Sequence, residues 1–372
     1  MALTGRGCRY LRSEPGSYSD CRRTNKTYSG DNRMKPFLLW VTIAVSFTSC
    51  SRDEIRPHSR QSTAMETYVS VTTYDGNLSQ HDAYALIDSA FAEINRIEHV
   101  MTDYSESSEI GTINRLAGKD TVEVSDEVVS LLQASLSFSQ QSAGAFDVSI
   151  GAIVKAWDFL SSEPEVPSRS KIRMVLRLTG FKNVMVEGTK VFLTEKGMRL
   201  DLGGIAKGYA VDRAVEILKR NGVKHAIVDI GGNLGVWWEG TRGVDSTVAE
   251  ILVRHPRKDG KYFGSLKVGT AGVSTSGDYQ RYFFHDGVRY HHIIDPATGY
   301  PARDVVSVTI IASDALNADA LSTLVFVLGR EKGMNFIKDR EGVEGIIVWE
   351  KEGVLHHELS PGLQGKFTRS DD

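Results

Sequence analysis

The stretch that says most about the fold reads Asp201-Leu202-Gly203-Gly204-Ile205-Ala206-Lys207-Gly208. It opens a segment in which Ala210, Val211, Ala214 and Leu218 recur at helical spacing. The glycines therefore lie where a turn enters a helix, and the free N–H groups and positive dipole end of a helix N-terminus favour phosphate. Lys207 would add a mobile cation. The glycine spacing fits neither a Walker motif nor a dinucleotide fingerprint, so a glycine-rich turn beside a surface lysine is an equally weighted interpretation.

Outward from this stretch, helical and strand patterns alternate irregularly. Apolar residues recur at helical spacing over 86–101, and Ser125 before two acidic residues is typical of a helix N-cap. Runs of β-branched residues at 225–230 and 305–312 predict strands. Hairpin patterns outnumber strand–helix–strand units, which predicts an α+β fold with largely antiparallel sheets and packed helices. No low-complexity linker interrupts 64–366, so this segment is expected to form one catalytic unit.

A second constellation, Ala318-Asp319-Ala320-Leu321-Ser322-Thr323, lies in a helix predicted over 317–328. Asp319 and Thr323 are four residues apart and share a helix face, with Ser322 at its edge. Carboxylate and hydroxyl oxygens are hard ligands that suit Mg²⁺ better than zinc or copper. Water and substrate phosphate would have to complete the shell. A helix-start aspartate with ordinary hydroxyls is the simpler alternative, and the pattern alone favours it.

Two further segments are dense in polar and small residues. Ser274-Thr275-Ser276-Gly277-Asp278 precedes a strand predicted over 291–294, which runs into the turn signal Asp295-Pro296-Ala297-Thr298-Gly299. His292 in this strand is a candidate functional side chain, although a lone histidine is more often structural. The segment 142–151 places small residues around Phe146 and Asp147, and it would either cup a flat ring or turn a helix end into a strand.

The N-terminal region resembles an export signal. Residues 34–49 have a short basic start and an apolar core of roughly 14 residues, whereas a membrane-spanning helix needs about 20. The core leads into Phe47-Thr48-Ser49-Cys50, which resembles a bacterial lipobox, so Cys50 is expected to carry lipid and to begin the mature chain. An uncleaved anchor helix is the alternative.

The flanking segments receive simpler interpretations. Residues 1–33 are rich in arginine without an apolar periodicity, and we interpret them as an upstream extension preceding the true start at Met34. Residues 50–63 are interpreted as a tether and 367–372 as a polar tail.

Composition narrows the function classes. The formal charge is −3 and hydrophobic residues make up 41%, an ordinary globular balance. No basic stripe with interleaved aromatic residues is present, so no nucleic-acid partner is expected. Besides Cys50, the only cysteines are Cys8 and Cys21, so the sequence after Cys50 contains no thiol for a disulfide or a thiolate metal site.

Together and in this order, the motifs resemble the ApbE family, the FAD:protein FMN transferases. The resemblance runs from about Met65 to Leu363 and is strongest at 144–148, 201–208, 228–232, 274–278, 292–296 and 318–320. It implies two lobes with the FAD site between them. It further implies FAD contacts at Met65, Tyr104, Ala145, Phe146, Asp147, Asp201, Lys207 and Ile294. The implied Mg²⁺ ligands are Asp319, Thr323, Ser322 and the backbone carbonyl of Gly204.

The resemblance also implies a reaction. FMN would pass from FAD to a threonine or serine hydroxyl of an acceptor protein, forming a phosphoester and releasing AMP. His292 is the candidate base and Asp278 the alternative. The acceptor is expected to be a membrane-associated redox protein, with the lipid-anchored domain facing the periplasm from the inner membrane. Two other functions stay open: a Mg²⁺-dependent pyrophosphatase that splits FAD into FMN and AMP, and a non-catalytic flavin-binding lipoprotein.

Two positions depart from the family pattern. The family usually has Met-Gly-Thr at its first motif, where this chain has Met65-Glu66-Thr67. Glutamate is expected to hinder a close backbone approach to the ligand. Some relatives carry a carboxylate at the position of Ser322, and a neutral hydroxyl there is expected to bind a metal more weakly.

Overall fold

The computed structural model describes residues 57–245 and 247–370. The interpretations of 1–33, of the signal segment 34–49 and of the lipid site at Cys50 lie outside these residues. In the part that is described, no helix is both long enough and apolar enough to cross a bilayer.

An eight-stranded sheet forms the centre of the fold, and every neighbouring pair of its strands is antiparallel. The prediction of an α+β fold with largely antiparallel sheets is therefore confirmed. In spatial order the strands are β1 (His58–Ala64), β2 (Thr67–Thr73), β6 (His225–Ile230), β7 (Asn233–Trp238), β10 (Ala271–Gly277), β15 (Ser307–Ala312), β16 (Glu344–Lys351) and β17 (Val354–Leu359).

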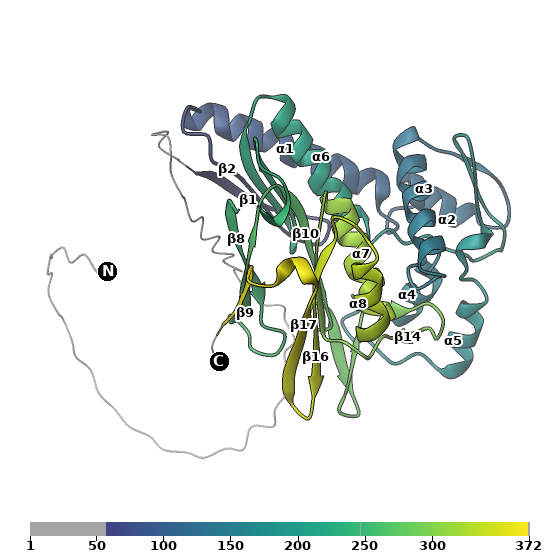
Figure 1. Cartoon of the computed structure of the whole chain (residues 1–372). Coiled ribbons are helices and arrows are strands. Elements are labelled where there is room, and N and C mark those ends of the chain that lie inside the picture. The colour runs from purple at the N-terminus through teal and green to yellow at the C-terminus, as the bar shows by residue number, and fades with distance from the viewer. Residues whose placement is uncertain (1–56, 246, 371–372) are drawn as a thin grey trace, which may run out of the picture. The chain divides into compact units, whose positions relative to one another are not determined.

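Helices cover one face of this sheet, as Figure 1 shows for α1, α6, α7 and α8. Their bounds are Gln80–Met101, Ala206–Arg220, Ala315–Leu328 and Arg330–Lys338. Helix α7 is apolar almost all round because it is buried between the sheet and α6; Ala318, Leu321 and Leu324 are at most 3% exposed. This burial fixes α7, and with it the side chains of Asp319 and Thr323.

The opposite face packs on a three-stranded sheet of β8 (Ala249–Arg254), β9 (Tyr262–Val268) and β18 (Phe367–Arg369). A separate apolar cluster joins the two layers; Ile227 and Val236 lie in the large sheet, and Ile251 and Leu266 in the small one. The interpretation of 367–372 as a tail is wrong for its first three residues. Phe367 stacks on Phe263, which holds this short strand against β9.

The segment between α1 and α6 forms the third part of the fold. It contains α2 (Glu109–Leu116), α3 (Asp126–Gln141), α4 (Gly151–Trp157), α5 (Arg169–Leu176) and a sheet of β3 (Val122–Glu123), β5 (Lys190–Leu193) and β4 (Val184–Glu187). One apolar cluster continues from this segment into the helices on the large sheet. The two parts, which correspond to the expected lobes, therefore share a core.

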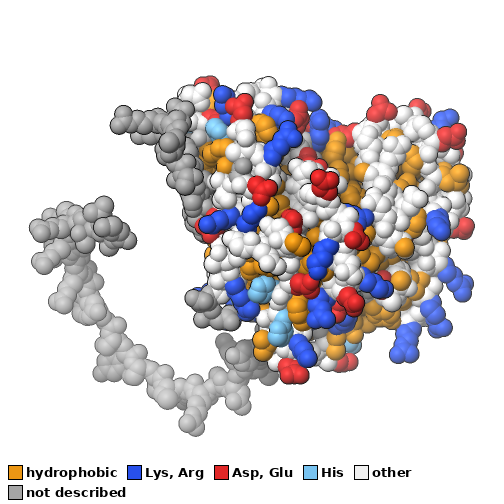
Figure 2. All heavy atoms as spheres, in the orientation of Figure 1, with side chains coloured by type: hydrophobic (Ala, Val, Ile, Leu, Met, Phe, Trp, Pro, Cys, Tyr) orange, Lys and Arg blue, Asp and Glu red, His pale blue; other side chains and the backbone are white. Residues whose placement is uncertain are grey.

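Short elements complete the described chain. Two small hairpins pair β11 (Tyr282–His285) with β12 (Val288–His291), and β13 (Ile294–Asp295) with β14 (Tyr300–Pro301). Single 3₁₀ turns span Phe181–Asn183, Gly243–Asp245 and Pro361–Leu363. Figure 2 shows lysine and arginine interspersed with aspartate and glutamate over the face that it draws, so that face carries no continuous patch of one sign.

Local predictions fared differently from one another. The Ser125 cap is confirmed, because its hydroxyl accepts a hydrogen bond from Val128 N. The tether interpretation is wrong for 58–63, which lie in β1. This edge strand is polar and mostly exposed, so it has no apolar pattern and is defined by backbone pairing with β2. The strand predicted over 291–294 is also wrong: β12 ends at His291 and β13 begins at Ile294, which leaves His292 between them.

Candidate active site

The loop 201–208 is held by its own backbone. Asp201 N donates to Val148 O at 2.8 Å, and Asp201 Oδ1 accepts a hydrogen bond from Gly203 N at 2.7 Å. Burial raises the pKa of Asp201, and its bond to Gly203 opposes this effect. Helix α6 begins at Ala206, and no side chain of the described residues caps its N-terminus through the N-cap residue Ile205. Of its first N–H groups, that of Ala206 donates to Leu202 O and that of Gly208 to Asp319 Oδ2, which leaves the N–H of Lys207 for an anionic ligand.

This loop meets α7 through two glycines. Gly208 N donates to Asp319 Oδ2 at 2.9 Å. A Cβ atom on Gly208 would lie 2.2 Å from Ala315 O and 2.7 Å from Asp319 Cβ, so this helix contact admits only glycine. At Gly204, a Cβ would lie 3.5 Å from Thr323 Oγ1 and 3.1 Å from the Phe146 ring. The structure therefore brings the loop, α7 and Phe146 together, as the sequence predicted.

The donor groups at this junction fit a hard cation. Asp319 is 3% exposed, and burial raises its pKa while the charge of Lys207 opposes the shift. Its Oδ2 is engaged by Gly208, which leaves Oδ1 to face another partner. Among the residues described, no three His, Cys, Asp or Glu side chains converge as a metal cage. One carboxylate, the Thr323 hydroxyl and the Gly204 backbone would give part of an oxygen shell, the kind of set that Mg²⁺ accepts when phosphate and water supply the rest.

Ser322 occupies a different environment from its neighbour Thr323. It is fully buried, its hydroxyl donates to Asp319 O at 3.0 Å, and it lies 3.1 Å from Ser274 Oγ and 2.8 Å from Ser276 Oγ. Those partners surround the oxygen. The structure thus gives Ser322 a place in a hydroxyl network behind the cation position.

His292 lies in the gap between β12 and β13. Its Nδ1 is 3.3 Å from Arg281 O, and its backbone N donates to the same carbonyl at 3.1 Å. Because a carbonyl only accepts, Nδ1 carries the proton and Nε2 keeps its lone pair. Burial lowers the pKa of His292 to about 3, and the charge of Arg281 adds to the effect. The ring is therefore neutral at physiological pH, with Nε2 able to accept a proton.

The neighbouring His291 is structural. It is 4% exposed, its Nε2 lies 2.7 Å from Ala302 O, and its Nδ1 accepts from Ile293 N at 3.3 Å. Burial lowers its pKa to about 4. Both ring nitrogens are thus engaged, which separates the two adjacent histidines by role.

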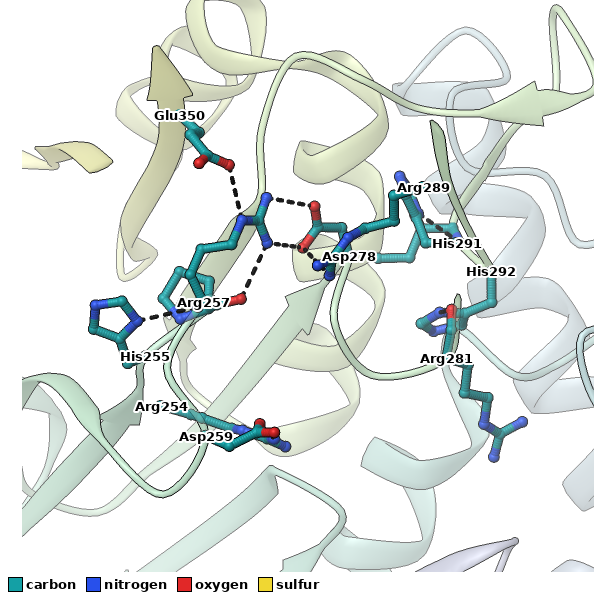
Figure 3. Close-up of polar contacts among 12 residues, drawn as sticks. Arg254, His255, Arg257, Asp259, Asp278, Arg281, Arg289, His291, His292 and Glu350 are labelled. Atoms are coloured by element: carbon teal, nitrogen blue, oxygen red, sulfur yellow. Dashed lines mark hydrogen bonds and ion pairs between the residues drawn. The ribbon is translucent and has the colours of Figure 1, made fainter. Parts of the chain in front are cut away.

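Asp278, the alternative base, is committed to an ion pair. Its two carboxylate oxygens accept from Arg257 Nη1 and Nη2 at 2.7 and 2.8 Å, and Arg257 Nε bonds Glu350 at 2.8 Å. Arg289 lies 3.8 Å from the same carboxylate. Figure 3 shows Asp278 turned toward Arg257, while His292 lies beside Arg281. Of the two predicted bases, His292 has the available nitrogen.

Tyr104 and the first motif lie beside Asp201. Tyr104 is 65% exposed, yet its surroundings raise the pKa of its hydroxyl, first by removing solvent and then through the carboxylates of Glu66, Asp103 and Asp201. Arg281, which opposes that shift, pairs with Glu66 at 2.9 Å. The hydroxyl of Tyr104 is therefore within the electrostatic influence of Asp201, Asp103 and Glu66.

Met65 and Glu66 form the two-residue turn between β1 and β2, and both have positive φ, 50° and 59°. Such a backbone suits glycine, which explains the family preference at the second position. Here Met65 N donates to Glu98 Oε1 at 2.8 Å, and the Glu66 side chain reaches outward to Arg281. The Glu66 carboxylate is thus fixed by its ion pair with Arg281, the residue whose carbonyl holds His292.

The remaining predicted FAD contacts differ in burial and in whether their polar atoms already have partners. Half-buried Ala145 and the buried ring of Phe146 lie on the loop that touches Gly204. Both carboxylate oxygens of Asp147 accept hydrogen bonds, Oδ1 from Ser149 in the same loop and Oδ2 from Phe181 N. Contact with FAD through these oxygens would require breaking those bonds. Ile294 is buried in a cluster with Trp157, and its backbone pairs with Pro301 in the β13–β14 hairpin.

Sequence reasoning missed Arg281, Asp103 and the role of Ser276. Arg281 holds His292 through its backbone carbonyl, so its residue type gave no signal. Burial raises the pKa of Asp103 to about 6, with Asp201 adding to the effect. Ser276 was quoted within a motif, but only the pairing of β10 beside α7 shows what its hydroxyl contacts.

The sequence model that describes the ApbE family matches residues 65–347. This chain belongs to the ApbE family. The span covers the Met65 turn, the 201–208 loop, His292 and the α7 pair, so the resemblance drawn from the motifs is confirmed.

Named relatives agree over most of the chain. An FAD:protein FMN transferase of Klebsiella pneumoniae is 37% identical over 75% of this chain and 86% of its own length. The FAD:protein FMN transferase of Treponema pallidum is 34% identical over 84% of this chain and 91% of its own. The crystal structure of the ApbE protein from Thermotoga maritima superposes with a TM-score of 0.73 at 34% identity, covering 84% of this chain and 99% of that one.

Proposed function

We propose that this ApbE protein transfers FMN from FAD to a serine or threonine hydroxyl of an acceptor protein and releases AMP. The observation that carries the proposal is the junction of the 201–208 loop with Asp319 and Thr323, because it gathers a helix N-terminus, a lysine and a hard-ligand set at one point. These groups suit a pyrophosphate. The assignment of this pyrophosphate compound as FAD rests on two relatives named FAD:protein FMN transferases, each more than 30% identical to this chain.

Asp319, Thr323 and the carbonyl of Gly204 would hold Mg²⁺ at the pyrophosphate. When bound, the ion polarises the phosphoryl group and neutralises charge on the departing AMP. Lys207 Nζ donates to Gly203 O at 2.7 Å, which holds the ammonium over the same loop. With FAD bound, Lys207 would supply positive charge to the phosphates, and Asp319 would act on them through the metal ion.

His292 would move the proton. Its Nε2 takes the hydroxyl proton while the acceptor oxygen forms a bond to the FMN phosphorus, and the anhydride bond to AMP breaks with its electron pair leaving on AMP. The low pKa of free His292 arises first from burial and then from positive neighbours. A bound pyrophosphate would offset those positive charges and raise the affinity of Nε2 for a proton. Arg281 O fixes the ring so that Nε2 keeps one orientation.

The same residues would serve a water molecule, which makes FAD hydrolysis the second candidate. The observation that favours it is the open Nε2, because nothing in the described site distinguishes a protein hydroxyl from water at that atom. Comparing AMP release with and without an acceptor separates the two functions.

Two variants test the proposed roles. Asp319→Asn keeps the size of the side chain and an acceptor for Gly208 but removes the charge, so FAD should still bind while Mg²⁺-dependent AMP release falls by about 10²-fold or more. His292→Asn should leave Mg²⁺ binding intact and slow transfer by about 10²–10⁴-fold. Wild-type rates in either variant would refute the corresponding role.

The location of the protein is a separate proposal. A lipid on Cys50 would hold the domain at the periplasmic face of the inner membrane, near membrane-associated redox acceptors. The lipobox-like Phe47-Thr48-Ser49-Cys50 supports it. Cys50→Ser should release the protein into the soluble fraction of expressing cells, and unchanged membrane association would refute the lipid anchor.

A further inference from the structure

Three buried serine hydroxyl groups and the half-buried hydroxyl of Thr323 form a chain that ends at the proposed cation position. Ser274 and Ser276 alternate with Thr275 along β10, so both face α7, where Ser322 and Thr323 lie. Ser276 Oγ lies 2.8 Å from Ser322 Oγ and 3.4 Å from Thr323 Oγ1. Ser274 and Ser322 are at most 1% exposed and Ser276 is 8% exposed, so bulk water does not satisfy them.

Two oxygens that can only accept, Asn233 Oδ1 and Asp319 O, determine the direction of the hydrogen bonds in this network. Each hydroxyl has one proton to donate. Ser274 donates to Asn233 Oδ1, and Ser322 donates to Asp319 O at 3.0 Å; both of these acceptors lack a proton. Ser322 has two acceptors for its proton, Asp319 O and Ser274 Oγ at 3.1 Å, and in the arrangement that uses either of them its oxygen accepts from Ser276 at 2.8 Å.

The same assignment of hydroxyl protons extends from Ser276 to Thr323, the last member of the network. With its proton given to Ser322, Ser276 Oγ has lone pairs only for its remaining contact, at 3.4 Å, with Thr323 Oγ1. In this arrangement Thr323 donates to Ser276 and keeps its lone pairs for a ligand. Gly204 is the neighbouring loop residue, since a Cβ built on it would lie 3.5 Å from Thr323 Oγ1.

We propose that Ser276 is a positioning residue for Mg²⁺, which takes the proton of Thr323 so that the threonine oxygen presents lone pairs to the cation. This inference rests on the metal assignment of the proposed function and deepens it. A threonine hydroxyl that pointed its proton at the cation would repel it, so the direction of one O–H bond decides whether Thr323 is a ligand. Ser322 supports this order from behind and does not itself face the cation.

This arrangement accounts for the departure at position 322. A carboxylate there would add a charged oxygen, whereas the serine of this chain accepts from Ser276 and donates to the α7 backbone. The hydroxyl network orients one neutral ligand, the Thr323 hydroxyl, beside the Asp319 carboxylate. Partners in the second layer of a metal site commonly change affinity by about 10–100-fold when removed.

The test uses the full chain and compares Ser276→Ala with a matched control, Thr275→Val. Thr275 is the neighbour on the opposite face of β10, where its hydroxyl lies 2.8 Å from Thr309 Oγ1, so the control also removes one hydroxyl from the same strand. The first readout is the rise in melting temperature as Mg²⁺ is titrated. The second is the Mg²⁺ concentration that gives half-maximal AMP release from FAD.

Ser276→Ala should require about 10-fold more Mg²⁺ in both assays, with the rate at saturating Mg²⁺ close to wild type. Thr275→Val should match wild type, and Ser276→Thr, which keeps the hydroxyl, should restore affinity. Equal Mg²⁺ requirements in Ser276→Ala and Thr275→Val would overturn the role of Ser276. A wild-type chain with no Mg²⁺-induced shift would instead overturn the metal assignment together with this inference. Should Ser276→Ala not fold, Ser276→Cys, a weaker acceptor of similar size, gives the same comparison.

Discussion

Gly208 offers a direct test of how the phosphate loop is coupled to the metal helix. Its N–H donates to Asp319, and a methyl group at this position would lie 2.2 Å from Ala315 O and 2.7 Å from Asp319 Cβ. Ordinary contact begins near 3.4 Å, so Gly208→Ala leaves α6 and α7 about 1.2 Å too close. The nearest atom belongs to the backbone and cannot rotate away.

The magnitude follows from two opposing effects. Overpacking of a well-packed interface costs about 1–3 kcal/mol. Replacing glycine by alanine in a helix returns up to about 1 kcal/mol. The free energy of unfolding should therefore fall by about 1–2 kcal/mol, which lowers the melting temperature of a domain of this size by about 2–8 °C. A displacement of about 1 Å at Asp319 should reduce Mg²⁺-dependent turnover by about 10²-fold.

The assay combines thermal unfolding with AMP release at several Mg²⁺ concentrations. Gly208→Ser serves as a graded comparison, because its larger side chain should lower both quantities further than alanine does. Activity that falls while Mg²⁺ affinity stays at the wild-type value would mean that the helix contact does not position Asp319. An alanine variant with unchanged stability and turnover would refute the packing argument altogether.

Three further predictions concern the surroundings of the site. Trp157→Phe removes the indole N–H that donates to Gly299 O at 2.8 Å from a side chain only 1% exposed, so chemical denaturation should show a loss of about 2–4 kcal/mol; a loss below about 1 kcal/mol would contradict this. Asp147→Asn replaces an acceptor oxygen with an N–H₂ group facing the donors of Ser149 or Phe181, so it should cost about 1–3 kcal/mol by the same measurement, and a neutral effect would refute the bonding pattern. The pKa of His292 is lowered to about 3, so this histidine binds its proton more readily in the unfolded chain and destabilises the fold as the pH drops below 6.5, whereas buried carboxylates with raised pKa values, such as Asp103, act in the opposite direction. The measurement is therefore the difference in melting temperature between the wild-type chain and His292→Asn from pH 4 to 8; it should shift against the wild type as the pH falls, and a difference independent of pH would show that His292 is not buried as described.

Local pattern predicted those features that depend on local physics. The helix over 317–328 and the strand at 225–230 agree with α7 and β6 because a buried helix and a central strand each need a continuous apolar pattern. The edge strand β1 and the terminal strand β18 were missed, since their positions come from pairing with distant strands and not from their own composition.

The site was predicted through its chemistry and missed where it depends on geometry. Helical spacing placed Asp319 and Thr323 on one face of α7, and only the resemblance to the ApbE family placed Gly204 beside them, where the structure has it. The bidentate pair of Asp278 with Arg257 joins residues 21 positions apart, and no spacing rule predicts such a contact. For the same reason, two adjacent histidines became distinguishable only when their ring partners were known.

Flavin transfer itself is tested most directly by intact mass spectrometry of a candidate acceptor incubated with the protein, FAD and Mg²⁺. The account predicts an acceptor whose mass rises by one FMN phosphoester, with the label on a serine or threonine and AMP released in equal amount. Asp319→Asn should lower the formation of both products by about 10²-fold or more. Free FMN and AMP with an unlabelled acceptor would contradict transfer and favour hydrolysis, and FAD that stays intact would contradict catalysis.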